Sequence, residues 1–227
     1  MKKHLFFLIM IAAIGLTGCL REGIDTIALP FGKVPDAVIP VEIREQFSQY
    51  MPIYEGITPP NIEGDYLCQP DRLVFTSDNN FEVGHLFAPI YFKFANQAAS
   101  GTAVYSEMQG TSTSDASEVY VVGEGNNFTA YFISNVEHRD DDGNLTATAK
   151  LSEIVSGTLT SEGIMNYRNA FILLEKYDPN NELMNVNEYR VFEDGDGLAV
   201  RYNWSKALAD EKAGLLNKLQ RGKSLNK

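Results

Sequence analysis

The clearest structural signal in this chain is the run Phe128-Thr129-Ala130-Tyr131-Phe132-Ile133-Ser134-Asn135. Its even-numbered positions carry Phe, Ala, Phe and Ser, and its odd-numbered positions carry Thr, Tyr, Ile and Asn. Because successive side chains of a strand point to opposite faces of its sheet, this period of two predicts a β-strand.

Similar strands are expected on both sides of this run. They lie at residues 64–67 continued at 72–76, 86–96, 102–109, 118–122, 144–154, 157–160, 169–177, 188–192 and 198–202. Turn-forming Asn, Asp and Gly residues separate them, at 78–80, 123–127, 142–144, 179–181 and 194–197. Short, roughly evenly spaced strands without intervening helices predict an all-β, antiparallel domain over residues 61–204, either a barrel or a β-sandwich.

A short helix is expected before this domain, within residues 41–60, and it spans Val41 to Met51. Apolar side chains share one face of it at Ile43, Phe47, Tyr50, Met51 and Tyr54. Pro40 suits its first turn and Pro52 ends it. The polar face mixes acidic and basic residues, so we expect the helix to pack on the domain and not on a membrane surface.

A second helix is expected at the C-terminus, in a segment of helix and basic tail at residues 205–227. Ser205 is its predicted cap, and leucines share one face at Leu208, Leu215, Leu216 and Leu219. We expect this helix to dock on the domain. The alternative is contact of its basic end with an acidic partner or with peptidoglycan.

The N-terminus carries a targeting segment. Lys2 and Lys3 precede an apolar run that ends in Leu16-Thr17-Gly18-Cys19, and this run is shorter than the roughly 20 residues of a membrane span. The motif resembles the lipobox of bacterial lipoproteins. That resemblance implies a signal peptide at residues 1–18 and lipidation of Cys19, which would attach the protein to a membrane.

The residues after Cys19 refine this expectation. Leu20 stands where an Asp would signal retention at the inner membrane, so the resemblance implies a lipid-anchored outer-membrane protein on the periplasmic or cell-surface face. Residues 19–40 contain three prolines and read as an extended tether. Within them, Asp25-Thr26-Ile27 resembles a bacterial O-glycosylation acceptor.

The charge of the chain excludes some partners. Its 19 basic residues fall to 17 when Lys2 and Lys3 leave with the signal peptide, against 30 acidic residues, which gives −13. A balance this acidic argues against nucleic acid as a partner. Since Cys19 is committed to lipid, Cys68 remains the one thiol and no internal disulfide is expected.

The strand pattern can now be compared with a family. Gly64-x-Tyr66 entering the first strand resembles the Gly-x-Trp opening of lipocalin-type barrels, with Tyr in place of Trp. Residues 154–160 and 190–197 are also similar to those of uncharacterised lipocalin-like outer-membrane lipoproteins. This resemblance implies a lipocalin-like β-barrel with an apolar cup and no catalytic machinery. The closing Arg of the family would be Arg190 or Arg201.

Motifs that would support catalysis or metal binding are weak. His85 and His138 lie in different predicted segments, no zinc-ligand spacing exists, and no nucleophile elbow is present, so no catalytic residue, metal or cofactor is predicted. Asp140, Asp142 and Asn144 resemble the start of a calcium loop, but Leu151 stands where its bidentate Glu belongs. A hairpin turn explains these residues equally well.

Three classes of function remain open. A ligand-binding barrel would hold a small apolar or glycan-like molecule, with Tyr105, Tyr120, Tyr131 and Phe132 as the expected binding residues. A non-catalytic structural lipoprotein would instead contact a protein partner in the cell envelope. An enzyme is not expected, and a convergent pair of carboxylates with shifted pKa values in a cleft would be needed to support one.

Overall fold

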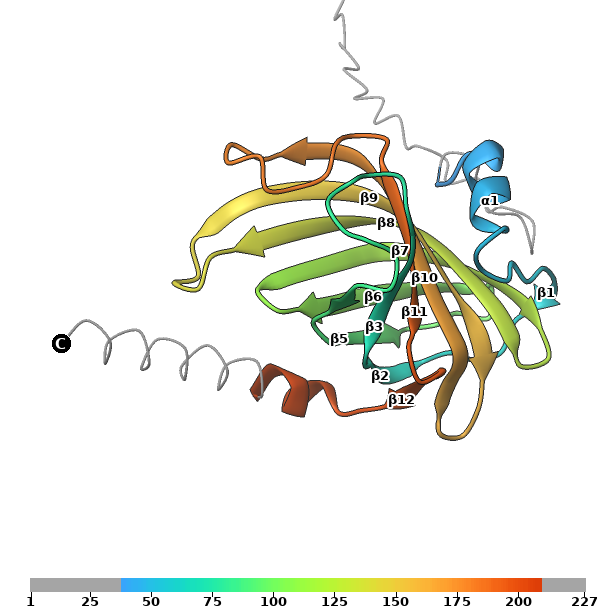
Figure 1. The fold of residues 1–227 in the computed structure, drawn as a ribbon. Coiled ribbons are helices and arrows are strands. Elements are labelled where there is room, and N and C mark those ends of the chain that lie inside the picture. Colours follow the sequence, from blue (N-terminus) through green and yellow to red (C-terminus); the bar gives the residue numbers. More distant parts are fainter. Residues whose placement is uncertain (1–37, 210–227) are drawn as a thin grey trace, which may run out of the picture.

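The alternating segments of the chain form one large, mainly antiparallel sheet in the computed structural model, which describes residues 38–209 (Figure 1). The prediction of an all-β, antiparallel protein is therefore confirmed. The strands are β1 (Ile57–Thr58), β2 (Gly64–Cys68), β3 (Asp71–Thr76), β4 (Leu86–Phe87), β5 (Ile90–Ala95), β6 (Thr102–Gln109), β7 (Ser112–Glu124), β8 (Asn127–Arg139), β9 (Leu145–Leu159), β10 (Gly163–Tyr177), β11 (Tyr189–Asp194) and β12 (Leu198–Arg201).

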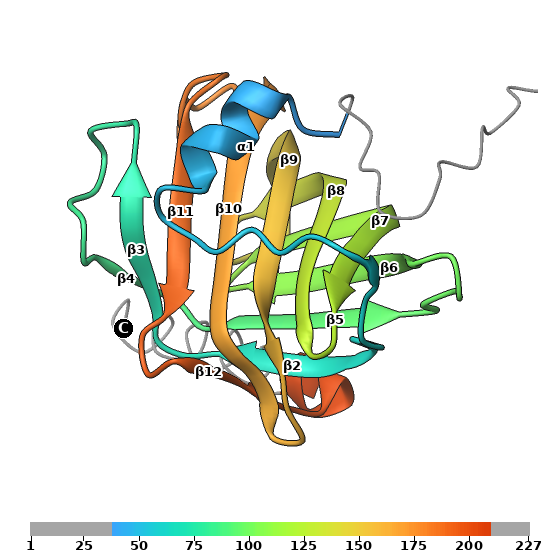
Figure 2. The same ribbon diagram turned by 90° about the vertical axis from the view of Figure 1, so that its right-hand side faces the viewer.

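Eight of these strands close into a ring. Their order is β12-β2-β5-β6-β7-β8-β9-β10, and β12 also pairs with β10. The closure uses the first part of β10, where Gly163 lies opposite Val200. Beyond a register irregularity, the later part of β10 pairs with β11 instead, and the sheet continues to β3 and β4. We call the end of the ring at which β12 pairs with both β10 and β2 the closed end. The other end, which β11 and β3 flank, is the open end (Figure 2).

Two glycines allow the strands near this closure to approach. A Cβ on Gly157 would lie 2.4 Å from Cγ2 of Ile164, and a Cβ on Gly163 would lie 2.1 Å from the carbonyl oxygen of Ala199. The sequence pattern predicted a break between two strands just before Gly157. The structure has one continuous strand, β9, because this glycine serves close packing and not a turn.

Two other expected strands are interrupted by proline. Residues 64–76 divide into β2 and β3 at Pro70, and residues 86–96 divide into β4 and β5 at Pro89. Proline has no backbone N–H to donate to a ladder, so it marks the ends of strands.

The closed end of the ring is filled by a cluster around Tyr66. The Tyr66 ring stacks on Phe92 with 5.3 Å between ring centroids, and its hydroxyl donates to the carbonyl of Ile62 at 2.9 Å. The guanidinium of Arg201 lies 5.3 Å from the centre of the Tyr66 ring. Further aromatic side chains, including Phe94, Phe128 and Tyr167, complete this interior core.

A second apolar cluster covers the outer face of the sheet. It joins α1 (Val41–Phe47) to outward-facing residues of β7 to β11 (Figure 2). Phe47 and Met51 are buried here, as the predicted apolar face requires. The helix ends at Phe47, before the expected Met51, and hydrogen-bonded turns follow up to Pro52.

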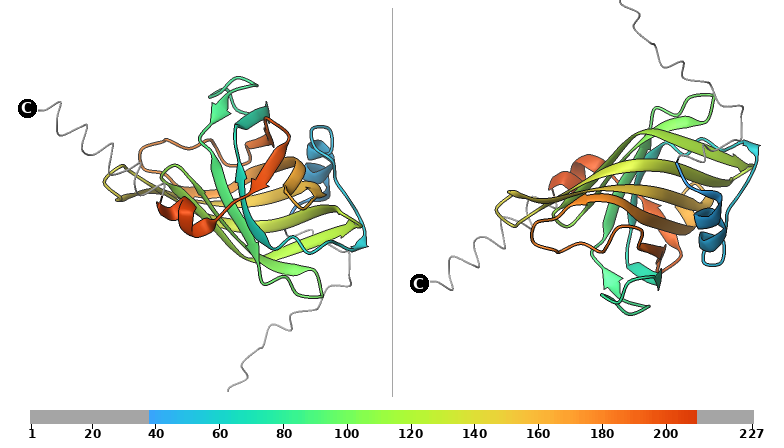
Figure 3. Two further views of the ribbon diagram at one scale, coloured as in Figure 1. Left: turned by 90° about the horizontal axis from the view of Figure 1, so that it is seen from below. Right: turned by 90° about the horizontal axis from the view of Figure 1, so that it is seen from above.

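The C-terminal helix begins at residue 204 and lies at the opposite side of the ring from α1 (Figure 3). Its cap is Asn203, whose side-chain oxygen accepts a hydrogen bond from the backbone N–H of Lys206 at 2.9 Å. The prediction of Ser205 as cap is wrong, because Ser205 already lies inside the helix. The predicted continuation of this helix beyond residue 209, the predicted signal peptide, Cys19 and Thr26 lie outside the described residues.

Within residues 38–209, no helix combines the length and the apolar composition needed to cross a bilayer.

Candidate functional site

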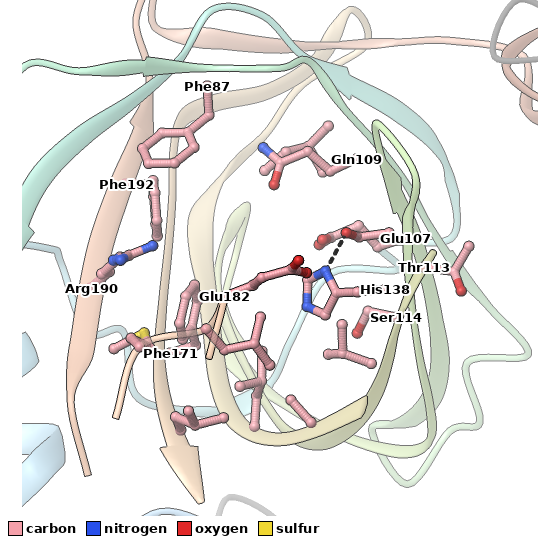
Figure 4. A pocket seen from close by; sticks show the side chains of 18 of the residues that line it. Phe87, Glu107, Gln109, Thr113, Ser114, His138, Phe171, Glu182, Arg190 and Phe192 are labelled. Atoms are coloured by element: carbon pink, nitrogen blue, oxygen red, sulfur yellow. Dashed lines mark hydrogen bonds between the residues drawn. The ribbon is translucent and has the colours of Figure 1, made fainter. Parts of the chain in front are cut away.

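A cavity of about 610 Å³ occupies the open end of the ring (Figure 4). Strands β3 to β11 line it, together with the loops after β3 and after β10. The aromatic core fills the other end, so the interior is divided into a packed half and a hollow half.

Phenylalanines form the apolar wall of the cavity. Phe171 stacks on Phe192 with 5.7 Å between ring centroids, and Phe87 meets Phe192 edge-on at 5.4 Å. Phe81 meets Phe87 edge-on at 4.9 Å. These rings come from β4, β10, β11 and the loop before β4, so residues distant in the sequence build one continuous surface.

A polar stripe crosses the opposite wall from β6 to β9. Glu107 on β6 accepts a hydrogen bond from the hydroxyl of Tyr105, and its register partner on β7 is Ser114. Glu153 on β9 accepts hydrogen bonds from the hydroxyls of Ser134 and, at 3.4 Å, of Ser114. Ser114 thus lies opposite Glu107 and donates to Glu153, so its hydroxyl stands between the strands that carry the two carboxyl groups.

Burial changes the protonation of this pair. It raises the pKa of Glu107 to about 7 and that of Glu153 to about 8, and the negative charge of Glu107 adds to the rise at Glu153. Hydrogen bonds from Tyr105, Ser134 and Ser114 act in the other direction, but burial prevails. At neutral pH the pair therefore retains protons that exposed glutamates would have lost.

Asp71 on β3 adds a third carboxyl group. Its side chain is buried, and its Oδ2 accepts a hydrogen bond from Nε2 of Gln109 at 2.9 Å. Burial raises its pKa to about 8. Its Oδ1 has no hydrogen-bond partner among the described residues, and neither has Oδ1 of buried Asn169 on β10. Since buried acceptors are almost always paired, two unpaired ones in the lining of one cavity are a specific feature.

Positive charge near these acids is already engaged elsewhere. Arg190 forms an ion pair with Asp78 at 2.7 Å and lies 5.0 Å from the centre of the Phe81 ring. None of the ion pairs in residues 38–209 includes Asp71, Glu107 or Glu153. Burial lowers the pKa of His138, so this residue, whose Nδ1 lies 2.6 Å from the Ser112 hydroxyl, is mainly neutral at pH 7.

The four aromatic residues predicted to bind a ligand do not converge. Tyr105 and Phe132 are neighbours in the interior core, with 4.5 Å between ring centroids, whereas Tyr131 and Tyr120 belong to the outer cluster beneath α1. None of the four lines the cavity. The four aromatic residues do lie on strands that line the cavity, but the sequence could not show which side chains of those strands face it.

The sequence did not lead us to predict that Glu107 and Glu153 line a cavity. A signal was present for Glu107, because it lies two residues after Tyr105 on the same strand and must share the inward face. For Glu153, the neighbouring Ile154 and Val155 are both buried, so alternation is lost locally and no comparable signal exists.

The other polar motifs have structural explanations. Oδ1 of Asp140 accepts hydrogen bonds from the backbone N–H of Asp142 and of Asn144, which closes the turn between β8 and β9. Asp194 accepts from the backbone N–H of Gln69 and of Asp196. In the part of the chain that the structure describes, no three carboxylate, His or Cys side chains are grouped closely enough to hold a metal ion.

The chain matches no protein-family model, no curated protein and no solved structure. The chemistry of the cavity and the N-terminal motif are consequently the features that bear on function.

Proposed function

We propose that this protein is a lipid-anchored lipoprotein of the outer membrane, and that its strand ring is a lipocalin-like barrel which binds a small molecule. The observation that carries the binding role is the cavity at the open end of the ring. Its volume of about 610 Å³ lies within the range typical of small-molecule sites, and it combines an aromatic wall with a few buried polar groups.

Two observations support the barrel over a sandwich. The pairing of β12 with both β2 and β10 joins the two edges that a sandwich would leave apart. Tyr66, at the position of the lipocalin Trp, lies beneath Arg201, which is therefore the better candidate for the closing Arg. Arg190 is engaged with Asp78 instead.

The anchor proposal rests on the lipobox and is tested separately. On this proposal, Cys19→Ala abolishes lipidation and prevents recovery of the protein with outer-membrane lipoproteins in envelope fractionation. Cys68→Ala is the matched control, because Cys68 is buried in the domain and should leave the membrane association unchanged. Unchanged lipidation of the Cys19→Ala protein would contradict the anchor.

The binding role predicts a molecule that co-purifies with the protein from its own cell envelope. Native mass spectrometry of the full-length protein should detect a stoichiometric adduct. Ala149 lines the cavity, so Ala149→Phe should project a ring into it, obstruct the ligand and remove the adduct. Thr148 is the residue directly before Ala149 on β9 and points to the other face, so Thr148→Phe should retain the adduct. Retention of the adduct by both variants would refute binding in this cavity.

A second candidate function is hydrolysis, and it is favoured by one observation. Glu107 and Glu153 interact in the cavity with pKa values raised into the neutral range, as an acid and base pair would require. On this alternative, wild-type protein would convert the co-purified molecule to products of different mass, and Glu107→Gln would bind it without conversion. If the wild-type protein left the co-purified molecule unchanged, hydrolysis would be contradicted and binding would remain the proposed function.

A further inference from the structure

We propose that the ligand is an organic cation, an amine whose ammonium group binds among Asp71, Glu107 and Glu153 and whose apolar body lies on the phenylalanine wall. This inference rests on the proposed function and specifies the chemical class of its ligand. It follows from the distribution of charge, of unpaired acceptors and of aromatic rings in the one cavity.

Charge is the first argument. Three carboxyl groups line the cavity, and within residues 38–209 no Lys or Arg forms an ion pair with any of them. Buried acids are costly unless a positive group or a proton accompanies them. A cationic ligand would supply the missing charge, whereas an anionic ligand would add to the repulsion.

Hydrogen bonding is the second argument. Within residues 38–209, Oδ1 of Asp71 and Oδ1 of Asn169 are buried acceptors without a hydrogen-bond partner, and the two side chains are only 1% and 4% exposed. Both residues belong to the cavity lining. A primary ammonium group carries three donors and no acceptor, so it suits a site built from acceptors. A hydroxyl group offers a single donor and no charge.

The strand register is the third argument, because it places three of the four acceptor residues, Asp71, Glu153 and Asn169, opposite a ring of the phenylalanine wall. Phe87 lies opposite Asp71. In the same way, Phe171 lies opposite Glu153 and Phe192 lies opposite Asn169. Cross-strand partners share one face of a sheet at a spacing of roughly 5 Å. The faces of such rings attract cations, and their area accommodates an alkyl or aryl body.

This arrangement favours an organic cation over a metal ion. The acceptors lie on four strands, β3, β6, β9 and β10, and among residues 38–209 no three carboxylate, His or Cys side chains are grouped closely enough to coordinate a metal ion. An amine with an apolar body would contact the rings and the acceptors at the same time.

The test compares three eight-carbon probes that differ only in their head group. Octylammonium, 1-octanol and octanoate are titrated into the full-length protein by isothermal calorimetry at pH 7, in non-ionic detergent with detergent-only titrations subtracted. Charge-assisted hydrogen bonds contribute more free energy than neutral ones. Octylammonium should therefore bind at least about tenfold more tightly than 1-octanol. Octanoate should bind most weakly.

Variants that remove charge at constant shape locate the effect. Asp71→Asn and Glu153→Gln should each weaken octylammonium binding by about tenfold and leave 1-octanol binding unchanged. Glu175→Gln is the matched control, because the Glu175 side chain is 73% exposed on β10 and lies outside the cavity lining.

Each outcome separates the two proposals. Binding of octanoate or 1-octanol at least as tight as that of octylammonium would overturn the cation proposal and leave a ligand-binding cavity. Equal octylammonium binding by wild type, Asp71→Asn and Glu153→Gln would also overturn it. Absence of binding by all three probes would overturn the cation proposal, while the native adduct lost in Ala149→Phe would still support the cavity.

Discussion

Replacing Glu153 by Gln should stabilise the protein, and the gain should grow with pH. Glu153 is 3% exposed and its pKa is raised from the usual 4.5 to about 8 by burial and by the charge of Glu107. Between these pH values the folded protein holds a proton that the unfolded chain has lost, so stability falls as the pH rises. One pKa unit corresponds to roughly 1.4 kcal/mol, so the loss reaches the order of 5 kcal/mol by pH 8.

Glutamine has the same shape and remains neutral, so it escapes this loss. We therefore expect the free energies of unfolding of wild type and Glu153→Gln to agree within about 1 kcal/mol near pH 4.5 and to differ by roughly 2–5 kcal/mol at pH 8. Urea titrations followed by near-ultraviolet circular dichroism at both pH values give these free energies. Glu175→Gln removes an exposed carboxylate and should show no comparable gain.

The comparison of wild type with Glu153→Gln isolates the effect of the Glu153 carboxyl group. The remaining titratable side chains of the cavity are Asp71, Glu107, His138, Arg139, Glu182 and Arg190. All of them are present in both proteins, so the difference between the two pH curves reports Glu153 and its coupling to Glu107. If Glu153→Gln were equally destabilised at both pH values, the argument that burial disfavours the Glu153 carboxylate would be refuted.

Three further predictions concern the same molecule. Octylammonium binding at pH 7 should release protons from the acids, measured by calorimetry in buffers of different ionisation enthalpy, and proton uptake would contradict their raised pKa values. Tyr66→Ala should cost about 3–5 kcal/mol of stability in urea unfolding, whereas Tyr177→Ala, at an exposed site, should cost under about 0.5 kcal/mol. Gly157→Ala should cost about 1–3 kcal/mol, because the new Cβ would lie 2.4 Å from Ile164, and an unchanged melting temperature would contradict that close approach.

Local patterns predicted the secondary structure because they act over a few residues. The alternation at residues 128–135 lies inside β8, and the apolar face around Phe47 packs on the sheet as expected. The pattern could not give the extent of β9, because a glycine used for close packing has the same sequence signature as a glycine in a turn. Closure of the ring by β12 depends on a partner about 35 residues away, near Gly163, and no local pattern encodes it.

The site was less predictable than the fold for a related reason. Both faces of β8 are buried, one inside the ring and one beneath α1, so Phe132 and Tyr131 look alike in the sequence although they face opposite ways. Acidic residues are normally exposed, so a pattern-based prediction assigns Glu107 and Glu153 to solvent. Their inward position becomes apparent only when the strand register and the hollow half of the ring are known.

The stability cost of the acids also bears on what the cavity is for. Apolar residues in place of buried charges are often neutral or stabilising, so a purely structural ring would be more stable without Asp71 and Glu153. Sites where a chain departs from such local rules tend to be functional. If a cation offsets the cost, octylammonium should raise the melting temperature more at pH 8, where Asp71 and Glu153 are partly ionised, than at pH 5, where they are protonated. In Glu153→Gln this pH dependence should shrink. An equal rise in melting temperature at both pH values would show that the acids do not contribute to ligand binding and have a structural role instead.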